Sequence, residues 1–179
     1  GPESFQGGRW LRSVFGVLEL TVDDASVAPV SHYFRGMPVG LRGSGDVGAV
    51  LHVRGAVLEA PSRLDVTDAR LAVDFGQSTA EGSGRVDARV EAAAAAEADA
   101  GADGSPRALL HLELDDYRLG RRGADATHLV GTSLTLDGST TTLDLLDPNP
   151  DIDATVAVEG AQIPDFAAYG SYLPEGSPI

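Results

Sequence analysis

The chain contains no cysteine and no lysine. The absence of cysteine excludes disulfides, a thiolate nucleophile and sulfur-ligated metal sites. All 13 basic residues are therefore arginines, and 27 acidic residues outnumber them, which gives a net charge of −14. Such a charge repels nucleic acids and anionic lipid surfaces, so neither is an expected partner of the exposed surface. No apolar run approaches the roughly 18 residues of a membrane-spanning helix.

Side chains that carry out catalysis or bind metals are also sparse. The histidines lie far apart in the sequence and lack the paired spacing of a metal site: His32, His52, His111 and His128. The acidic pairs Asp23-Asp24 and Asp115-Asp116 are expected at strand ends. Neighbours on a strand point to opposite faces, so these pairs are poorly placed for acid–base chemistry. The sequence therefore predicts no enzyme, no cofactor and no metal site.

One glycine-rich segment, Gly43 to Gly48, matches the G-x-G-x-x-G pattern of dinucleotide-binding loops. That pattern requires a strand before it and a helix after it, within a βαβ unit. Here an alternating, strand-like segment follows from Ala49 to Val53. We interpret the glycines as a turn that leads into a strand.

Period-two alternation dominates the remaining sequence. Between Val86 and Val90, and again between Leu110 and Leu114, every second residue is apolar and the residues between are charged or polar. Such alternation predicts strands with one apolar face, roughly nine of them along the chain. One apolar face per strand is typical of an antiparallel sheet with one side away from water. The low-complexity segment 92–106 breaks the pattern and is expected to be a flexible insertion, or a short Ala-rich helix at its start.

A longer similarity links the two ends of the chain. Leu20–Pro38 aligns without gaps with Val156–Pro174, and each copy has a strand-like start followed by helical spacing. Short helical connectors are therefore expected near 25–34 and 163–172. The chain is long enough for one domain. We interpret residues 1–2 as the scar of a cleaved tag and residues 3–179 as a single β-rich fragment of a longer repeat protein.

Three segments carry a family resemblance: SRLDVTDARLAVDFG, GSGRVDARVEA and VEGAQIPDFAAYGSYLP. They resemble the AsmA-like and TamB-like proteins of Gram-negative envelopes. The resemblance implies a long curled β-sheet with an apolar concave face and no catalytic residues. It further implies a periplasmic protein that is anchored in the inner membrane, outside this fragment, and takes part in outer-membrane assembly and phospholipid movement.

The predicted fold is thus all-β, a curled antiparallel sheet with an apolar concave groove and short helical connectors. A closed β-sandwich, which would bury the same residues, is the alternative. An acyl chain needs a continuous apolar track without specific polar contacts, and alternating strands supply one. The residues expected to line the groove are Val47, Leu51, Val53, Leu64, Val66, Leu71, Val73, Phe75, Val86, Val90, Leu110, Leu112, Leu114, Leu134, Leu136, Leu143, Leu145, Val156 and Val158.

The expected function is to shield or conduct phospholipid acyl chains between the inner and outer membranes, as a segment of a periplasm-spanning protein that supports outer-membrane assembly. Acyl chains and outer-membrane assembly proteins are the expected partners, and nucleic acid is not. The alternative function is a structural or adhesive β module that binds a protein partner.

Overall fold

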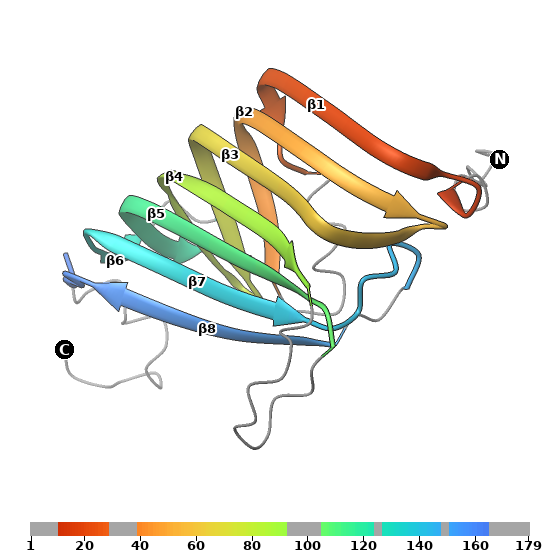
Figure 1. The fold of residues 1–179 in the computed structure, drawn as a ribbon. Coiled ribbons are helices and arrows are strands. Elements are labelled where there is room, and N and C mark those ends of the chain that lie inside the picture. Colours follow the sequence, from red (N-terminus) through yellow and green to blue (C-terminus); the bar gives the residue numbers. More distant parts are fainter. Residues whose placement is uncertain (1–10, 29–38, 93–104, 124–126, 148–150, 165–179) are drawn as a thin grey trace, which may run out of the picture.

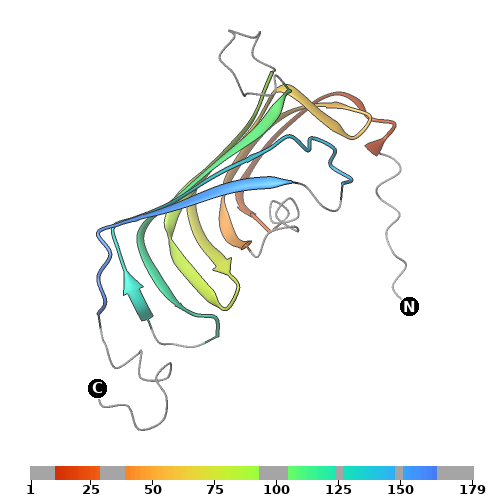
Figure 2. The same ribbon diagram turned by 90° about the horizontal axis from the view of Figure 1, so that it is seen from below.

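The structure is a computed structural model that describes residues 11–28, 39–92, 105–123, 127–147 and 151–164 of the 179-residue chain. Its elements are β1 (Phe15–Ser26), β2 (Val39–Arg54), β3 (Val57–Phe75), β4 (Ser78–Glu91), β5 (Arg107–Arg121), β6 (Thr127–Val130), β7 (Ser133–Thr140) and β8 (Ile152–Glu159). They form one antiparallel sheet in the order β1-β2-β3-β4-β5-β7-β8, and β6 pairs with the end of β5. Because β1 and β8 do not pair with each other, the sheet is open (Figure 1). The predicted curled antiparallel sheet is confirmed (Figure 2).

The curl comes from a bend in the middle of unusually long strands. Strands β2 to β5 are 14 to 19 residues long, whereas a mean strand has about 5–6 residues. In three strands an aspartate takes a left-handed backbone conformation, with φ of 48° at Asp24, 47° at Asp68 and 50° at Asp116. The strand ladders lose register beside these residues. Aspartate tolerates this conformation better than most residues, and such bulges bend a strand and increase its twist.

Glycines on the intervening strands let the backbones meet at this bend. A Cβ atom on Gly43 would lie 2.0 Å from the Arg70 carbonyl oxygen, and one on Gly84 would lie 2.0 Å from the Glu113 carbonyl oxygen. Neither position can hold a side chain without moving the neighbouring strand. We call this line the crease, and it consists of Asp24, Asp68 and Asp116, of Gly160 (φ 61°) directly after β8, and of Gly43, Gly45, Gly82 and Gly84.

The crease corrects two of the sequence interpretations. Gly43 to Gly48 lies inside β2, so the expected turn into a strand was wrong. The pairs Asp23-Asp24 and Asp115-Asp116 lie within β1 and β5 rather than at their ends. In both cases the residues favour turns in isolation, but here they provide the bulges of a continuous strand.

The strand count also differs from the sequence prediction. The alternation of Leu64 with Val66, and of Leu71 with Val73 and Phe75, predicts two separate strands, but these segments are the two halves of β3 on either side of the crease. The spacing of Leu143 and Leu145 also predicts a strand, but both residues belong to the connection between β7 and β8. Strand β6 was not predicted, because its residues THLV show little alternation.

The two predicted helical connectors lie mostly outside the described residues. In the first, Ala25 and Ser26 continue β1 instead of starting a helix. Near the second, Gln162 forms a β-bridge with Val130. Val27–Ala28 and Ile163–Pro164, the other described residues of the connectors, are not helical. Residues 29–34 and 165–172 of the connectors, and residues 93–104 of the predicted insertion, lie outside the described part of the chain.

Exchanging a crease glycine tests the close backbone approach. We expect Gly84→Ala to lower the free energy of unfolding by about 2 kcal/mol or more, because its methyl group meets a backbone oxygen. Gly48→Ala is the matched control, since a Cβ there meets nothing within 4 Å, and it should change stability by less than about 0.5 kcal/mol. Urea denaturation of both variants measures the difference, and equal stabilities would contradict the role of the crease.

The segment between β4 and β5 is predicted to be dispensable. The ladder of these two strands continues up to the pair Glu91 and Arg107, so a short turn can join them there. We expect deletion of residues 92–105 to leave the fold intact. A thermal-unfolding loss above about 2 kcal/mol, which is typical of core damage, would show that the segment packs against the sheet.

Candidate apolar site on the concave face

A row of apolar residues crosses the concave face from one edge of the sheet to the other. Its members are direct cross-strand partners: Val22, Val47, Val66, Val86, Leu112, Leu136 and Val156. Val66 and Leu112 in the middle are 0% and 2% exposed, whereas Val22 and Val156 at the ends are 39% and 48% exposed. The face is therefore a packed core at its centre and an uncovered apolar surface at both edges.

A second row of cross-strand partners lies beside the first, on the side of the β2–β3 hairpin tip, and several of its side chains are smaller. Its members are Leu20, Ala49, Leu64, Ala88, Leu110, Gly138 and Ala154. The alternation of Leu with Ala and Gly leaves space above the sheet. A space of this kind in the middle of a sheet must be covered by another segment or by a ligand, since protein interiors are otherwise close-packed.

The covering segment is the connection between β7 and β8, residues 141–147, which we call the strap. It runs across the concave side to the tip of the β2–β3 hairpin (Figures 1 and 2). The Leu58 amide donates to the Leu143 carbonyl at 2.9 Å, and the Leu145 amide donates to the Ala56 carbonyl at 2.9 Å. These bonds tie together two regions that are far apart in sequence.

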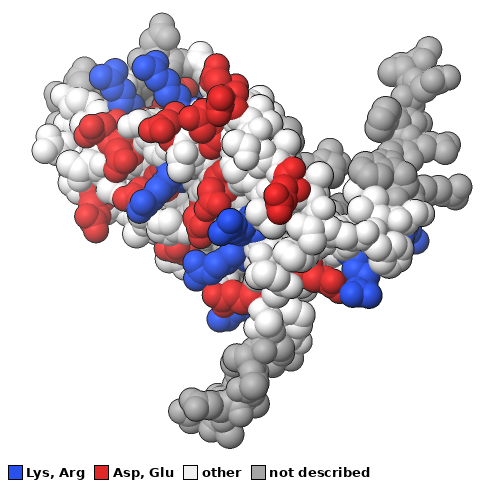
Figure 3. All heavy atoms as spheres, turned by 45° about the horizontal axis from the view of Figure 1, so that its top comes forward, with Lys and Arg blue, Asp and Glu red and all other residues white. Residues whose placement is uncertain are grey.

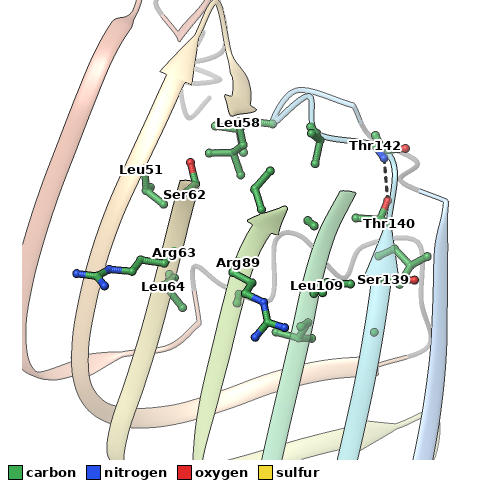
Figure 4. A pocket seen from close by; sticks show the side chains of 18 of the residues that line it. Leu51, Leu58, Ser62, Arg63, Leu64, Arg89, Leu109, Ser139, Thr140 and Thr142 are labelled. Atoms are coloured by element: carbon green, nitrogen blue, oxygen red, sulfur yellow. Dashed lines mark hydrogen bonds between the residues drawn. The ribbon is translucent and has the colours of Figure 1, made fainter. Parts of the chain in front are cut away.

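Strap and sheet enclose a partly open cavity of about 170 Å³. Its walls are mainly apolar and include Leu51 from β2, Leu58 and Leu64 from β3, Val90 from β4, and Leu143 from the strap (Figure 4). The walls also contain Thr140 and Thr142, but the Thr142 amide donates to the Thr140 hydroxyl at 3.0 Å. The cavity thus offers apolar contact and few available polar groups.

The predicted lining residues divide into three groups. Those on strands β2 to β7 share the concave face through the ladder registers. Leu143 and Leu145 were expected on that face but lie on the strap opposite it, where both line the cavity. Val156 and Val158 share the face but lie on the edge strand, where they are about half exposed. Lining of a lipid path remains a prediction for all of them.

Several residues of the site were missed by the sequence analysis. Leu58, Ala88, Ala108 and Ile152 line the cavity. Ala88 and Ile152 do follow the alternation of their strands, which could have identified them. Leu58 is also in phase with Leu64 and Val66, because the register shift between Val50 and His52 amounts to two residues and leaves the face unchanged.

Beyond the crease the concave face is filled by its own side chains. Leu41, Val73, Ala80 and Tyr117 are 0–2% exposed and belong to the same core cluster as the central row. The Tyr117 ring lies against Gly131, where a Cβ would come within 2.5 Å of it. Among the described residues, the apolar surface that stays open therefore lies on the strap side of the crease and at the edge strands.

The convex face is charged. Acidic and basic side chains lie side by side there (Figure 3), for example Arg85 and Glu113, whose closest nitrogen–oxygen distance is 2.6 Å. Burial and a hydrogen bond with the facing Asp87 raise the pKa of Asp65. The His111 Nδ1 atom lies 2.7 Å from an Asp137 carboxylate oxygen. Within the described ranges no group of His, Asp and Glu side chains is arranged to hold a metal ion.

One ionic cluster on this face is buried. Asp74, whose side chain is 5% exposed, accepts two hydrogen bonds from Arg42 at 2.9 Å, one from the Thr79 hydroxyl at 2.6 Å and one from Arg122. Hydrogen bonding by Arg42, and then by Thr79 and Arg122, outweighs the effect of burial and lowers the pKa of Asp74 from 3.8 to about 2. The cluster joins β2, β3, β4 and the turn after β5.

The lowered pKa predicts a pH-dependent stability term. The ionised form of Asp74 stabilises the fold by about 2 kcal/mol when the pH is above 3.8, the unfolded value. This contribution is lost as the pH falls towards about 2. The stability difference between the wild type and Asp74→Asn should therefore shrink across that window in urea titrations. The exposed Asp153→Asn serves as the control, and a difference independent of pH would contradict the assignment.

Comparison with protein-family models, with curated proteins and with solved structures gives no match. Among the described residues no helix has the length and apolar character needed to cross a bilayer.

Proposed function

We propose that this chain is a non-catalytic segment of a periplasm-spanning envelope protein that shields phospholipid acyl chains on their way between the inner and outer membranes. The observation that carries this proposal is the uncovered apolar surface of an open sheet, which leads from the edge strands to the cavity under the strap. Anchoring in the inner membrane and a contribution to outer-membrane assembly belong to the same proposal. The family resemblance of the sequence supports both.

The chemistry of the cavity suits a hydrocarbon chain. Its leucine and valine walls can remove apolar surface from water, which contributes about 25 cal/mol per Å². Its two threonine hydroxyls already accept hydrogen bonds within the chain, Thr140 from the Thr142 amide at 3.0 Å and Thr142 from the Asp151 amide at 3.4 Å. A volume of about 170 Å³ is below the roughly 300 Å³ at which pockets for whole small molecules begin. The cavity therefore holds part of one acyl chain, and the remainder lies along the exposed apolar edge.

Charge restricts how a lipid reaches this site. The net charge of −14 and the charged convex face oppose adsorption to an anionic bilayer surface. Individual lipids would instead enter from the end of the sheet, as a chain moves along an apolar track. This mode of transfer fits a shielding segment better than a membrane-bound enzyme.

One observation favours the second candidate, a structural or adhesive β module. The centre of the concave face is a closed core, with Val66 and Leu114 at 0% exposure. A protein whose face were filled in this way throughout would have no continuous path for a lipid. The two functions differ in whether the purified chain carries lipid.

Lipid extraction with native mass spectrometry of the purified chain tests the proposal. We expect copurifying phospholipid, and we expect Ala88→Phe to lower its amount at least several-fold because the ring fills the cavity. Ala157→Phe is the matched control, since Ala157 is exposed on the convex face of β8 and should keep the wild-type level. Lipid-free wild-type protein that also fails to take up a fluorescent fatty acid would overturn the proposal.

A further inference from the structure

We propose that the free edge of β8 is a docking site for an extended partner segment, which adds to the sheet as one more antiparallel strand. The segment has the chemistry of strands β2 and β4: Gly-Ser-Gly followed by apolar residues at every second position. The proposal concerns a protein partner and does not depend on lipid binding.

The first observation is a four-residue pattern that recurs at the crease. Its occurrences are Val22-Asp-Asp-Ala25, Val66-Thr-Asp-Ala69, Leu114-Asp-Asp-Tyr117 and Val158-Glu-Gly-Ala161. The third residue has a positive φ in every case. In the first three, the pattern lies in a strand that pairs with the strand following it in the chain. β8 leads into the fourth, but among the described residues it pairs with β7 alone.

The second observation is that β2 and β4 are variants of one strand. In the two segments LRGSGDVGAVL (41–51) and AEGSGRVDARV (80–90), the glycines, the serine, one valine and one alanine coincide. Each pairs with the preceding patterned strand in the same register, since Val47 faces Val22 and Val86 faces Val66. Applied to β8, this register places the valine of the partner opposite Val158 and its second glycine opposite Ala161.

The third observation is that this edge has unpaired backbone groups and little protection. The Glu159 carbonyl accepts from the Thr132 amide at 3.1 Å and so points to the inside of the sheet. Backbone direction alternates along a strand, so Val156 and Val158 direct their amide and carbonyl groups outward. Edge strands are usually protected by lysine, proline or bulges. β8, with the sequence IDATVAVE, has no lysine or proline, and its two valines are exposed on the concave face.

Charge favours the β4 type of partner over the β2 type. In the expected register, the residue before the partner's valine approaches Glu159, which is exposed on the convex face. That residue is Arg85 in β4 and Asp46 in β2. An arginine there forms a cross-strand pair of opposite charge, whereas an aspartate is repelled.

Disulfide trapping tests both docking and register. The chain has no cysteine, so Ala157→Cys introduces a single thiol on the convex face of β8. Ala157 lies between Val156 and Val158, whose backbone groups point to the free edge, so Ala157 itself would form a non-hydrogen-bonded pair with the new strand. In such a pair the Cα atoms are about 4.5 Å apart, which is within reach of a disulfide. The probe is the synthetic peptide 79–91 with cysteine in place of Asp87, because Asp87 faces Asp65, the equivalent of Ala157, in the β3–β4 ladder.

We expect this peptide to be trapped at least fivefold faster than peptides with the cysteine at the positions of Arg85 or Arg89, which are two residues out of register. N-methylation of the peptide at Val86 removes an amide that points to β8 and should abolish the preference. N-methylation at Arg85, whose amide points to solvent, should not. These peptide controls leave the fold of the chain untouched.

Three outcomes would overturn the proposal. The first is equal trapping of all three cysteine positions, and the second is insensitivity to N-methylation at Val86. The third is preferential formation of a disulfide-linked dimer of the chain in the presence of excess peptide, because this edge would then be an interface between two copies.

Discussion

The close approach of neighbouring backbones at the crease is the constraint on which the rest of this structure depends. Without a bend, strands as long as β3, with 19 residues, would leave the apolar face of the single sheet bare. The left-handed aspartates supply the bend, and the glycines opposite them remove the side chains that would block it. The bend brings apolar rows from the two halves of each strand together, so a single sheet acquires a core.

The candidate site is a consequence of where this core ends. Near the crease the two halves fill the space between them with their own side chains. Farther from the crease the row of Leu, Ala and Gly cannot fill it, and the strap covers what remains. The apolar surface at β1 and β8 has no such cover, because each of these strands has a neighbour on one side only.

Alternation in the sequence was sufficient to predict the fold class and the face of most residues. Val86 and Leu112, for example, are adjacent members of one buried row, as their period indicated. The crease could not be predicted from single segments, since Asp115-Asp116 favours a turn unless neighbouring strands hold it. Leu143 and Leu145 have the spacing of a strand but form the strap. Val158 shows the same alternation as Val86, so its exposure follows only from the order of the strands in the sheet.

The direction of the edge strands has a consequence for self-association. An even number of antiparallel pairings separates β1 from β8, so both run the same way. Copies stacked edge to edge in one orientation would therefore have to join β8 to β1 as a parallel pair, which matches neither the ladders nor the crease of this sheet. Head-to-tail contacts of this kind are the ones that grow into open filaments. The topology thus hinders fibre formation although both edges are apolar and unpaired.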